Sequence, residues 1–280
     1  MQRIIVVLHG LLLLALLIPV GHAHPLPLVT ARWDTLAPGL DLGLFRGPWP
    51  TPVGDTTIVI LRADPQYWRP RFLCASEAGD AVGLTAKGWC ERHDLVVATN
   101  AGMFATDYRT HVGYMRSNGH VNCATVNQYQ SALAFEPTET GESHARIFDL
   151  DVVDIQTVIR GYRDIAQNLR LIKRPGINRW SAQDKMWSEA ALGEDSSGRF
   201  LFIFVRSPFS MHDLNNILLS LPIDLVCAQH LEGGPEAQLY IRYGDTEYEF
   251  IGSYETGFGE GDGNHHAWPI PNALAIGPRR

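Results

Sequence analysis

One carboxylate of this sequence has the setting of a reactive group. Residues 230–238 read HLEGGPEAQ, so Glu232 follows a largely apolar run and precedes two glycines and a proline. Burial at the end of an apolar strand would raise the pKa of this carboxyl group toward the range used in acid–base catalysis. Gly233 and Gly234 would let the chain turn sharply or approach a ligand closely. The alternative is that Glu232 caps a helix or pairs with an arginine, as many buried carboxylates do.

A second candidate stretch, TNAGMF at 99–104, also follows a predicted strand. Asn100 could offer a ligand an amide donor and acceptor, and Gly102 would leave room for it at the backbone, although the pattern also suits an ordinary turn. The polar loop that follows supplies an acid and cations, which could meet an anionic substrate or simply be solvated. Its candidate residues are Asp107, Arg109, His111 and Arg116.

Other reactive patterns are weak or missing. His265 and His266 lie near Glu260 and Asp262 and suggest a metal site, but their spacing matches neither an EF-hand nor an H-E-x-x-H helix. A loop is therefore the favoured interpretation. No G-x-S-x-G, P-loop or dinucleotide motif occurs in the sequence. We expect neither a metal nor a cofactor.

Strands and helices must position these candidates, and the apolar pattern predicts them. Apolar runs predict strands, and apolar residues at helical spacing after a capping Thr, Asp or Ser predict three helices. The order predicts a single α+β (or α/β) domain with a mixed β-sheet and flanking helices. Both candidate stretches then end buried strands, where open sheets commonly bind ligands. The expected strands are 56–63, 95–99, 131–135, 200–205, 224–228, 239–243 and 248–252, the helices 86–93, 154–169 and 211–221, and the loops 173–186 and 252–266.

The first residues predict export, to a periplasm or out of the cell. Arg3 precedes an apolar run over 4–20, and small residues follow at the spacing that a signal peptidase reads. We interpret 1–23 as a signal peptide rather than a retained anchor, because the run is at the short edge of a membrane span. Residues 24–55 are expected to wrap the surface and 56–280 to form the main domain, with no membrane span after cleavage.

The net charge limits the possible binding partners, and the cysteines raise the question of disulfide bonds. The formal net charge is -7, so bulk charge attracts neither nucleic acid nor anionic lipid. Export permits disulfides, and four cysteines allow three pairings, which the sequence cannot separate. Cys74 with Cys90 is favoured because it would close a short loop. The sequence carries no signal for an oligomeric state.

Together, these stretches resemble the phosphodiester glycosidase domain family. The family's Asn-Gly-Gly-Phe-Phe is similar to residues 100–104, and its Leu-Asp-Gly-Gly-Gly-Ser is similar to 231–236. QNLRLIKRPGI and AALGEDSSGRFLFIFV resemble the family stretches between them, so the likeness spans roughly 56–278 in the same order. WSEAALG, SPFSMHDL and LEGGPEA resemble an exported bacterial branch. The chain departs from the family pattern at Glu189, Glu232, Pro235 and Glu236.

The resemblance implies a hydrolase that cleaves a sugar from a glycosyl phosphodiester, either a small molecule or a polymer, at the anomeric carbon. The departing phosphate monoester has a proton of pKa about 6, so the reaction hardly needs a general acid and one carboxylate could suffice. We expect Glu232 to act as base or nucleophile, Asn100 to orient a sugar hydroxyl or water, and Asp107 to be a reserve acid. The expected substrate-binding residues are Gly102, Arg109, Arg116, Gly233 and Gly234 for the phosphate, and Trp187 and Trp268 for the sugar face.

Two other functions stay open. The first is a carbohydrate-binding or envelope-assembly domain that keeps the fold without turnover. The second is a metal-dependent hydrolase that uses the loop at 252–266. Removing the carboxylate at Glu232 distinguishes the glycosidase from the binding domain, and insensitivity to chelators would exclude the metal enzyme.

Overall fold

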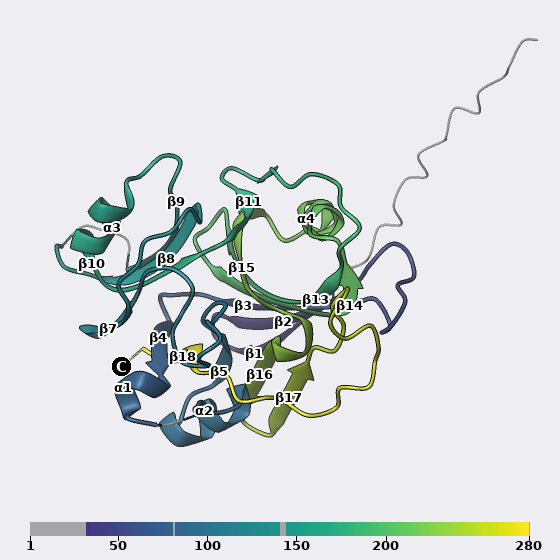
Figure 1. Ribbon diagram of the computed structural model, residues 1–280, viewed down its shortest axis with the longest axis horizontal. Coiled ribbons are helices and arrows are strands. Elements are labelled where there is room, and N and C mark those ends of the chain that lie inside the picture. The colour runs from purple at the N-terminus through teal and green to yellow at the C-terminus, as the bar shows by residue number, and fades with distance from the viewer. Residues whose placement is uncertain (1–31, 81, 141–143, 280) are drawn as a thin grey trace, which may run out of the picture.

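Strands dominate this molecule. The computed structural model describes residues 32–80, 82–140 and 144–279, with 47% strand and 13% helix. The strands form one eight-stranded and two five-stranded sheets (Figure 1). Every pairing among these strands is antiparallel, so the expected mixed sheet is wrong, and α+β describes the fold only loosely. Short turns join many consecutive strands, whereas parallel pairing would need long crossover connections.

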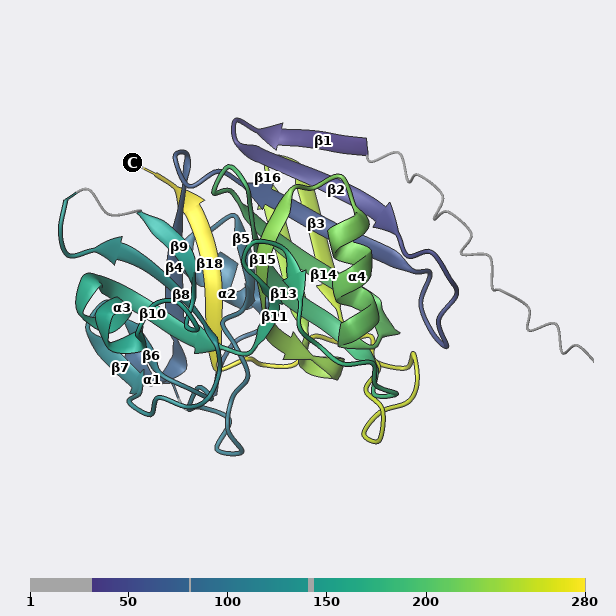
Figure 2. The same ribbon diagram turned by 90° about the horizontal axis from the view of Figure 1, so that it is seen from above.

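The eight-stranded sheet is buried on both faces. On β14 (Phe200–Phe209), Phe202 faces the central core, whereas its neighbours Leu201 and Ile203 pack with helix α4 (Met211–Ser220). Burial of both faces explains why this strand is apolar without interruption. Figure 2 shows α4 lying across this sheet. In order, the strands are β1 (Arg32–Ala37), β2 (Leu40–Arg46), β3 (Thr57–Ala63), β14, β13 (Trp187–Asp195), β15 (Leu225–Gly233), β11 (Arg170–Lys173) and β12 (Ile177–Asn178).

One five-stranded sheet carries helix α2 (Ala86–His93) on its outer face. Trp89 of α2 is fully buried there, and its indole N–H donates to the Ile270 carbonyl at 3.0 Å. The opposite face of this sheet meets the eight-stranded sheet in the central core. In order, the strands are β17 (Thr246–Ile251), β16 (Gln238–Tyr243), β5 (Val97–Asn100), β18 (Asn272–Pro278) and β4 (Trp68–Cys74), and the short helix α1 (Ala75–Ala78) follows β4.

The other five-stranded sheet corrects one predicted helix. Helix α3 (Ile155–Gly161) covers only half of the span expected at 154–169, and β10 (Tyr162–Asn168) takes the rest. Because β10 lies between two strands, both of its edges gain backbone hydrogen bonds, which outweigh the helical spacing of its apolar residues. In order, the strands are β7 (His120–Cys123), β6 (Met115–Ser117), β10, β8 (Ser131–Pro137) and β9 (Ala145–Asp149).

The predicted helix starts are confirmed. Thr85, Asp154 and Ser210 each accept a backbone N–H in the first turn of α2, α3 and α4. Such caps satisfy donors that have no partner within the helix. The loop expected at 252–266 contains no named strand or helix.

The N-terminal part was expected to wrap the surface before a first strand at 56. Within it, residues 32–46 instead form the hairpin β1–β2, which extends the eight-stranded sheet through pairing of β2 with β3. The predicted signal peptide at 1–23 lies outside the described residues. Among the described helices, none has the length and apolarity needed to cross a bilayer.

The cysteines are unpaired. Cys74, Cys90, Cys123 and Cys227 are all free thiols, so the favoured Cys74–Cys90 disulfide is not formed. Cys74 points into the central core, whereas Cys90 packs on the opposite face of the same sheet under α2. The sheet therefore separates the two sulfur atoms.

Candidate active site

Glu232 lies within a strand, not in a turn after it. Strand β15 continues to Gly233, and the turn that follows is a short 3-10 helix over Gly234–Glu236. The register of β15 against β13 shifts beside Leu231, because Ala190 pairs with Glu232 and the next residue pairs with His230. Such bulges commonly redirect side chains next to active sites.

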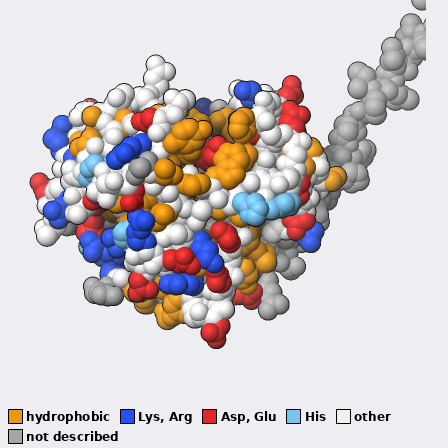
Figure 3. Space-filling model, turned by 60° about the horizontal axis from the view of Figure 1, so that its bottom comes forward, with side chains coloured by type: hydrophobic (Ala, Val, Ile, Leu, Met, Phe, Trp, Pro, Cys, Tyr) orange, Lys and Arg blue, Asp and Glu red, His pale blue; other side chains and the backbone are white. Residues whose placement is uncertain are grey.

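Glu232 lines a cavity of about 380 Å³ between the ends of β5 and β15. The two stretches that the sequence singled out therefore meet here. Three carboxyl groups, one histidine and several aromatic rings share the cavity wall. Figure 3 shows acidic side-chain atoms bordered by hydrophobic side chains in the upper part of the face drawn. The lining residues are Met103, Phe104, Ala105, Thr106, Tyr108, Leu169, Trp187, His230, Glu232, Gly233, Glu236 and Glu255.

The carboxyl group of Glu232 holds its proton at neutral pH. Burial raises its pKa to about 8, and the neighbouring charges of Glu236 and Glu189 act in the same direction. The attraction of His230 and one hydrogen bond, donated by the Gly233 amide at 3.1 Å, lower it only in part. Glu232 is thus a neutral acid in the free site.

A histidine and a second glutamate form a buried pair beside Glu232. The Nδ1 atom of His230 lies 2.8 and 2.9 Å from the two carboxylate oxygens of Glu189. The indole N–H of Trp187 donates to the same carboxylate at 2.7 Å. Burial alone would lower the pKa of His230, but the charge and hydrogen bond of Glu189 outweigh burial and raise it. With Nδ1 engaged, Nε2 is the ring nitrogen that can act toward the cavity.

Two glycines allow side chains of the cavity wall to pack directly against the backbone. A Cβ atom on Gly233 would lie 2.6 Å from the ring of Trp187, and one on Gly234 would lie 2.9 Å from a carboxylate oxygen of Glu255. Gly234 also has a φ of 65°, which glycine adopts most easily. Both glycines therefore bring cavity side chains against the backbone.

Gly102, within TNAGMF, lets buried side chains outside the cavity wall pack closely against the backbone. A Cβ atom there would lie 2.1 Å from Oδ1 of Asn168 and 2.3 Å from Nε2 of His111. His111 is fully buried, and desolvation lowers its pKa to about 4 despite the hydrogen bond between Nδ1 and the Gly113 carbonyl. It is therefore a neutral ring that supports the loop.

Asn100 ties the two candidate stretches together. Its Nδ2 donates to the Glu236 carbonyl at 3.0 Å, and its Oδ1 accepts from the Gln238 amide at 2.9 Å. The side chain is fully buried and does not line the cavity. A role for Asn100 in orienting substrate stays a prediction, whereas its role in holding the site together is visible.

The other predicted site residues lie away from the cavity wall. Asp107 accepts hydrogen bonds from the Thr110 hydroxyl and from the amides of Thr110 and Arg109, the amides at 2.9 and 3.0 Å, and these bonds hold its pKa below the usual value. Arg116 donates to the carbonyls of Ile159, Tyr162 and Arg163, next to the end of α3. The Trp268 carbonyl accepts from Gln238. Among the predicted site residues, the cavity wall includes Glu232, Gly233 and Trp187.

The cavity wall is acidic. Neither arginine nor lysine is among its lining residues in the described part of the chain. No group of three His, Cys, Asp or Glu side chains in the described residues has the geometry of a metal site. Asp262, in the loop considered above as an alternative metal site, accepts from Arg206 at 2.7 Å. A ligand in this cavity therefore meets proton donors on Glu232 and His230 rather than arginines.

Sequence reasoning missed part of this site. His230 stands within the HLEGG stretch, and its spacing of two from Glu232 on a strand was a usable signal for one shared face. Glu189 and Glu255 carry no such signal, because sheet pairing and the loop at 252–266 bring them in from distant positions. Tyr129 is a further neighbour, since the charge of Glu232 adds to burial in raising the pKa of its phenol.

Comparisons with known proteins identify a family and structures with a similar fold. The sequence profile of a family described as phosphodiester glycosidase matches residues 93–277. The zebrafish N-acetylglucosamine-1-phosphodiester alpha-N-acetylglucosaminidase catalytic domain, auto-inhibited by its pro-peptide, superposes with a TM-score of 0.59 at 14% identity, over 92% of this chain and 86% of that chain. A hypothetical protein from Synechocystis gives a TM-score of 0.55 at 12% identity, over 89% of this chain and 64% of that chain. These structural likenesses show a shared fold. No curated protein matches the sequence.

Proposed function

Because this chain belongs to the phosphodiester glycosidase family, we propose that it is a hydrolase that cleaves a sugar from a glycosyl phosphodiester at the anomeric carbon. Glu232 is the principal carboxyl group of the reaction. One observation carries this assignment: Glu232 shares a cavity with two other carboxyl groups, an aromatic wall and His230, which is paired with Glu189, and burial there raises the pKa of Glu232 to about 8.

The proton on Glu232 changes the role expected from the sequence. A carboxylate would repel an anionic phosphate, whereas a neutral carboxylic acid can approach it and donate a hydrogen bond. Glu232 therefore donates to the oxygen that bridges the sugar and the phosphorus, rather than starting as base or nucleophile. The sugar–oxygen bond breaks, the electron pair leaves with the phosphate, and the proton of Glu232 can follow it.

Protonated His230 supplies the positive charge that binds the phosphate group. Its pairing with Glu189 favours the protonated ring, and Nε2 can then donate to a phosphate oxygen. Arg109 and Arg116, expected earlier in this role, do not line the cavity. The Trp187 ring, which lines the cavity and lies 6.2 Å from the ring of His230, offers an apolar surface for the sugar face.

Water must complete the hydrolysis by attacking the anomeric carbon. Glu236 and Glu255 are the candidates to accept its proton, since both line the cavity with Glu232. Burial, with the nearby charge of Glu255, raises the pKa of Glu236. The site thus has an acid and a base on separate carboxyl groups, as most glycosidases do.

The experiment measures sugar release from UDP-N-acetylglucosamine, from other phosphodiester-linked sugars and from p-nitrophenyl glycosides. Wild type is compared with Glu232→Gln and with Glu249→Gln, which changes an exposed glutamate on β17. We expect wild type and Glu249→Gln to release sugar from the phosphate-linked substrates, and Glu232→Gln to lose about a hundredfold or more, the usual range for an acid–base group.

Two outcomes would overturn the proposal. Full activity in Glu232→Gln would remove the assigned carboxyl group. Saturable sugar binding without turnover by wild type would identify a carbohydrate-binding domain of the same fold instead. Export also remains a proposal, and N-terminal sequencing of mature protein from the cells that make it would test cleavage after Ala23.

A further inference from the structure

A second and larger cavity lies away from the candidate active site. Its volume is about 660 Å³, within the range of small-molecule sites. It runs beside β4, the edge strand of its sheet, between α2 on one side and the strands β6, β8 and β10 on the other. None of its lining residues is shared with the cavity around Glu232.

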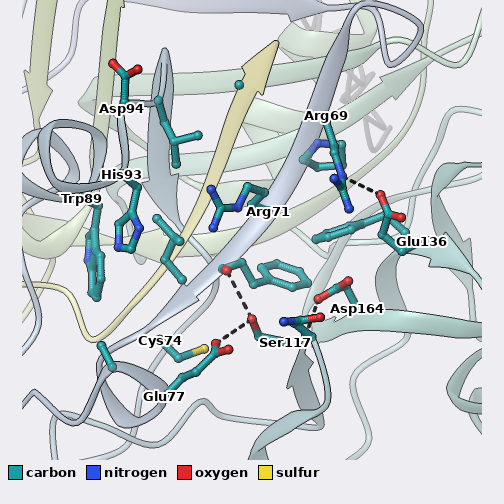
Figure 4. Close-up of a pocket in the computed structure, with 18 of the residues that line it drawn as sticks. Arg69, Arg71, Cys74, Glu77, Trp89, His93, Asp94, Ser117, Glu136 and Asp164 are labelled. Carbon is teal, nitrogen blue, oxygen red and sulfur yellow. Dashed lines mark hydrogen bonds and ion pairs between the residues drawn. The ribbon is translucent and has the colours of Figure 1, made fainter. Parts of the chain in front are cut away.

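One wall of this cavity is basic. Arg71 extends from β4 toward His93 of α2 (Figure 4). Among the described residues, the Arg71 guanidinium has no hydrogen-bond or ion-pair partner, and Nε2 of His93 is buried without one. His93 is held against the Trp89 ring, with centroids 5.9 Å apart. The solvent-exposed guanidinium of Arg71 is therefore free to bind a ligand carboxylate at this wall.

The opposite wall is acidic. Glu77 accepts from the Ser117 hydroxyl at 3.0 Å, and Asp164 accepts from the Asn118 amide at 2.6 Å. Both carboxyl groups lie close to Cys74, because their charges add to burial in raising the pKa of its thiol. In Figure 4 this group occupies the lower part of the cavity, away from Arg71. Each carboxyl group has acceptor capacity left for an ammonium group.

The floor between the two walls is apolar. The rings of Phe72 and Phe135 are in contact there, with centroids 4.8 Å apart. The other charged residues of the lining are paired, Arg69 with Glu136 at 2.8 Å and Asp94 with Arg242 at 3.5 Å. A ligand in this cavity therefore meets a positive end, an apolar middle and a negative end.

This charge pattern selects the class of ligand. A phosphate dianion would be attracted by Arg71 but repelled by Glu77 and Asp164. A peptide added as a further strand along β4 is disfavoured, because Pro70 has no amide hydrogen to offer it. A small molecule with opposite charges at its two ends satisfies both walls.

We propose that this cavity binds a short zwitterionic ligand of the amino-acid or peptide class, with its carboxylate at Arg71 and its ammonium group at Glu77 and Asp164. The site is separate from the proposed glycosidase site. The proposal therefore stands or fails independently of sugar release.

The test is calorimetric titration of the full chain with dialanine, in its all-L and all-D forms. We expect saturable binding of at least one form. N-acetylated dialanine and dialanine amide should bind roughly ten- to a hundredfold more weakly, the usual effect of losing a hydrogen bond to a charged group. Arg71→Met should lose the preference for the free carboxylate, and Glu77→Gln should weaken the preference for the free amine.

Matched controls separate a site from a general effect. Arg160→Met changes an exposed arginine of α3 outside the cavity and should bind dialanine as wild type does. Arg71→Met should keep its thermal unfolding midpoint and its sugar release, since Arg71 is exposed and outside the Glu232 cavity. Absence of saturable binding by both forms, equal binding of the blocked dialanines, or unchanged binding by Arg71→Met would each overturn the proposal.

Discussion

At the scale of single residues, the candidate site depends on where protons are held. Three carboxyl groups share one cavity without a lysine or arginine among its lining residues. If all three were ionised, an anionic substrate would be excluded. Burial keeps Glu232 neutral, and the Glu189–His230 pair holds one proton close to it. The arrangement thus makes an acidic wall compatible with the phosphate-linked substrate that we propose.

The first prediction concerns pH. Sugar release should fall as pH rises through about 8, because Glu232 then ionises and can no longer donate to the substrate. The measurement is kcat/KM between pH 5 and pH 10, a range chosen to bracket that pKa. Activity that keeps rising through pH 9 would contradict the assignment of Glu232 as acid.

The proton held by Glu232 should also affect how the free energy of unfolding depends on pH. The pKa of Glu232 is about 8 in the folded protein against 4.5 as its ordinary value, so the folded state binds the extra proton between these values. Its contribution is complete below the lower pKa and is lost as pH rises through the higher one. In urea unfolding, Glu232→Gln should therefore lose less stability than wild type between pH 5 and pH 9. Parallel pH curves would show that Glu232 titrates normally.

The second prediction concerns Glu189. Replacement by Gln removes the charge that raises the pKa of His230, so the ring should be neutral near pH 7. We expect kcat/KM to fall about a hundredfold, as for loss of an acid–base group. Glu189→Asp, which keeps the charge, should recover part of the activity. If Glu189→Gln and Glu189→Asp lose activity equally while both remain folded, packing rather than charge is the role of Glu189.

At the scale of elements, the sequence predicts those whose residues carry a local signal. The run 200–205 predicts a strand, and Ser210 predicts the start of α4, because burial and capping act over a few residues. The pairing of β10 is not local. Its strands come from positions up to about 50 residues away, so the helical spacing at 154–169 was misleading. The antiparallel direction of the strands is also decided by pairing between distant positions, so local patterns did not predict it.

The candidate site also contains residues that the sequence identifies and residues that it does not. Asn100 and Glu232 each stand at the end of an apolar strand, which the sequence shows, and the structure joins their stretches through hydrogen bonds. Arg116 was predicted to bind phosphate because a sequence shows which residues are charged but not which groups they contact in the fold. In the fold its guanidinium is used by three carbonyl groups at the end of α3. Glu189 and Glu255 could be found only by pairing strands and placing loops.

The third prediction concerns the element that carries TNAGMF. Gly102→Ala would place a methyl group 2.1 Å from Oδ1 of Asn168 and 2.3 Å from Nε2 of His111, and both neighbours are buried. We expect a loss of about 3 kcal/mol or more in the free energy of unfolding, at the upper end of overpacking effects. Gly161→Ala is the control, since a Cβ atom there meets nothing within 4 Å. Equal urea midpoints for the two variants would show that the Gly102 segment can shift freely.

At the scale of the whole molecule, one core joins three sheets. The central cluster contains residues from the eight-stranded sheet and from both five-stranded sheets, so the three sheets bury apolar side chains against one another. The two candidate cavities lie where different elements meet: one between the ends of β5 and β15, the other beside the edge strand β4. The two cavities share no lining residue, so the two proposed sites can be tested independently.

The last prediction tests this packing through the thiols. Burial raises the pKa of Cys74, Cys90 and Cys227 to about 12, whereas Cys123 is only half-buried. Because the thiolate is the reactive form, a disulfide reagent should modify Cys123 first in the native protein and the other three only as the protein unfolds. Cys123→Ser should remove the fast phase and leave the slow one. In unfolded protein without reductant, four thiols should titrate. A lower number would mean that a disulfide forms, and if peptide mapping placed it between Cys74 and Cys90, the strand arrangement around β4 would have to differ, because the sheet separates these two residues.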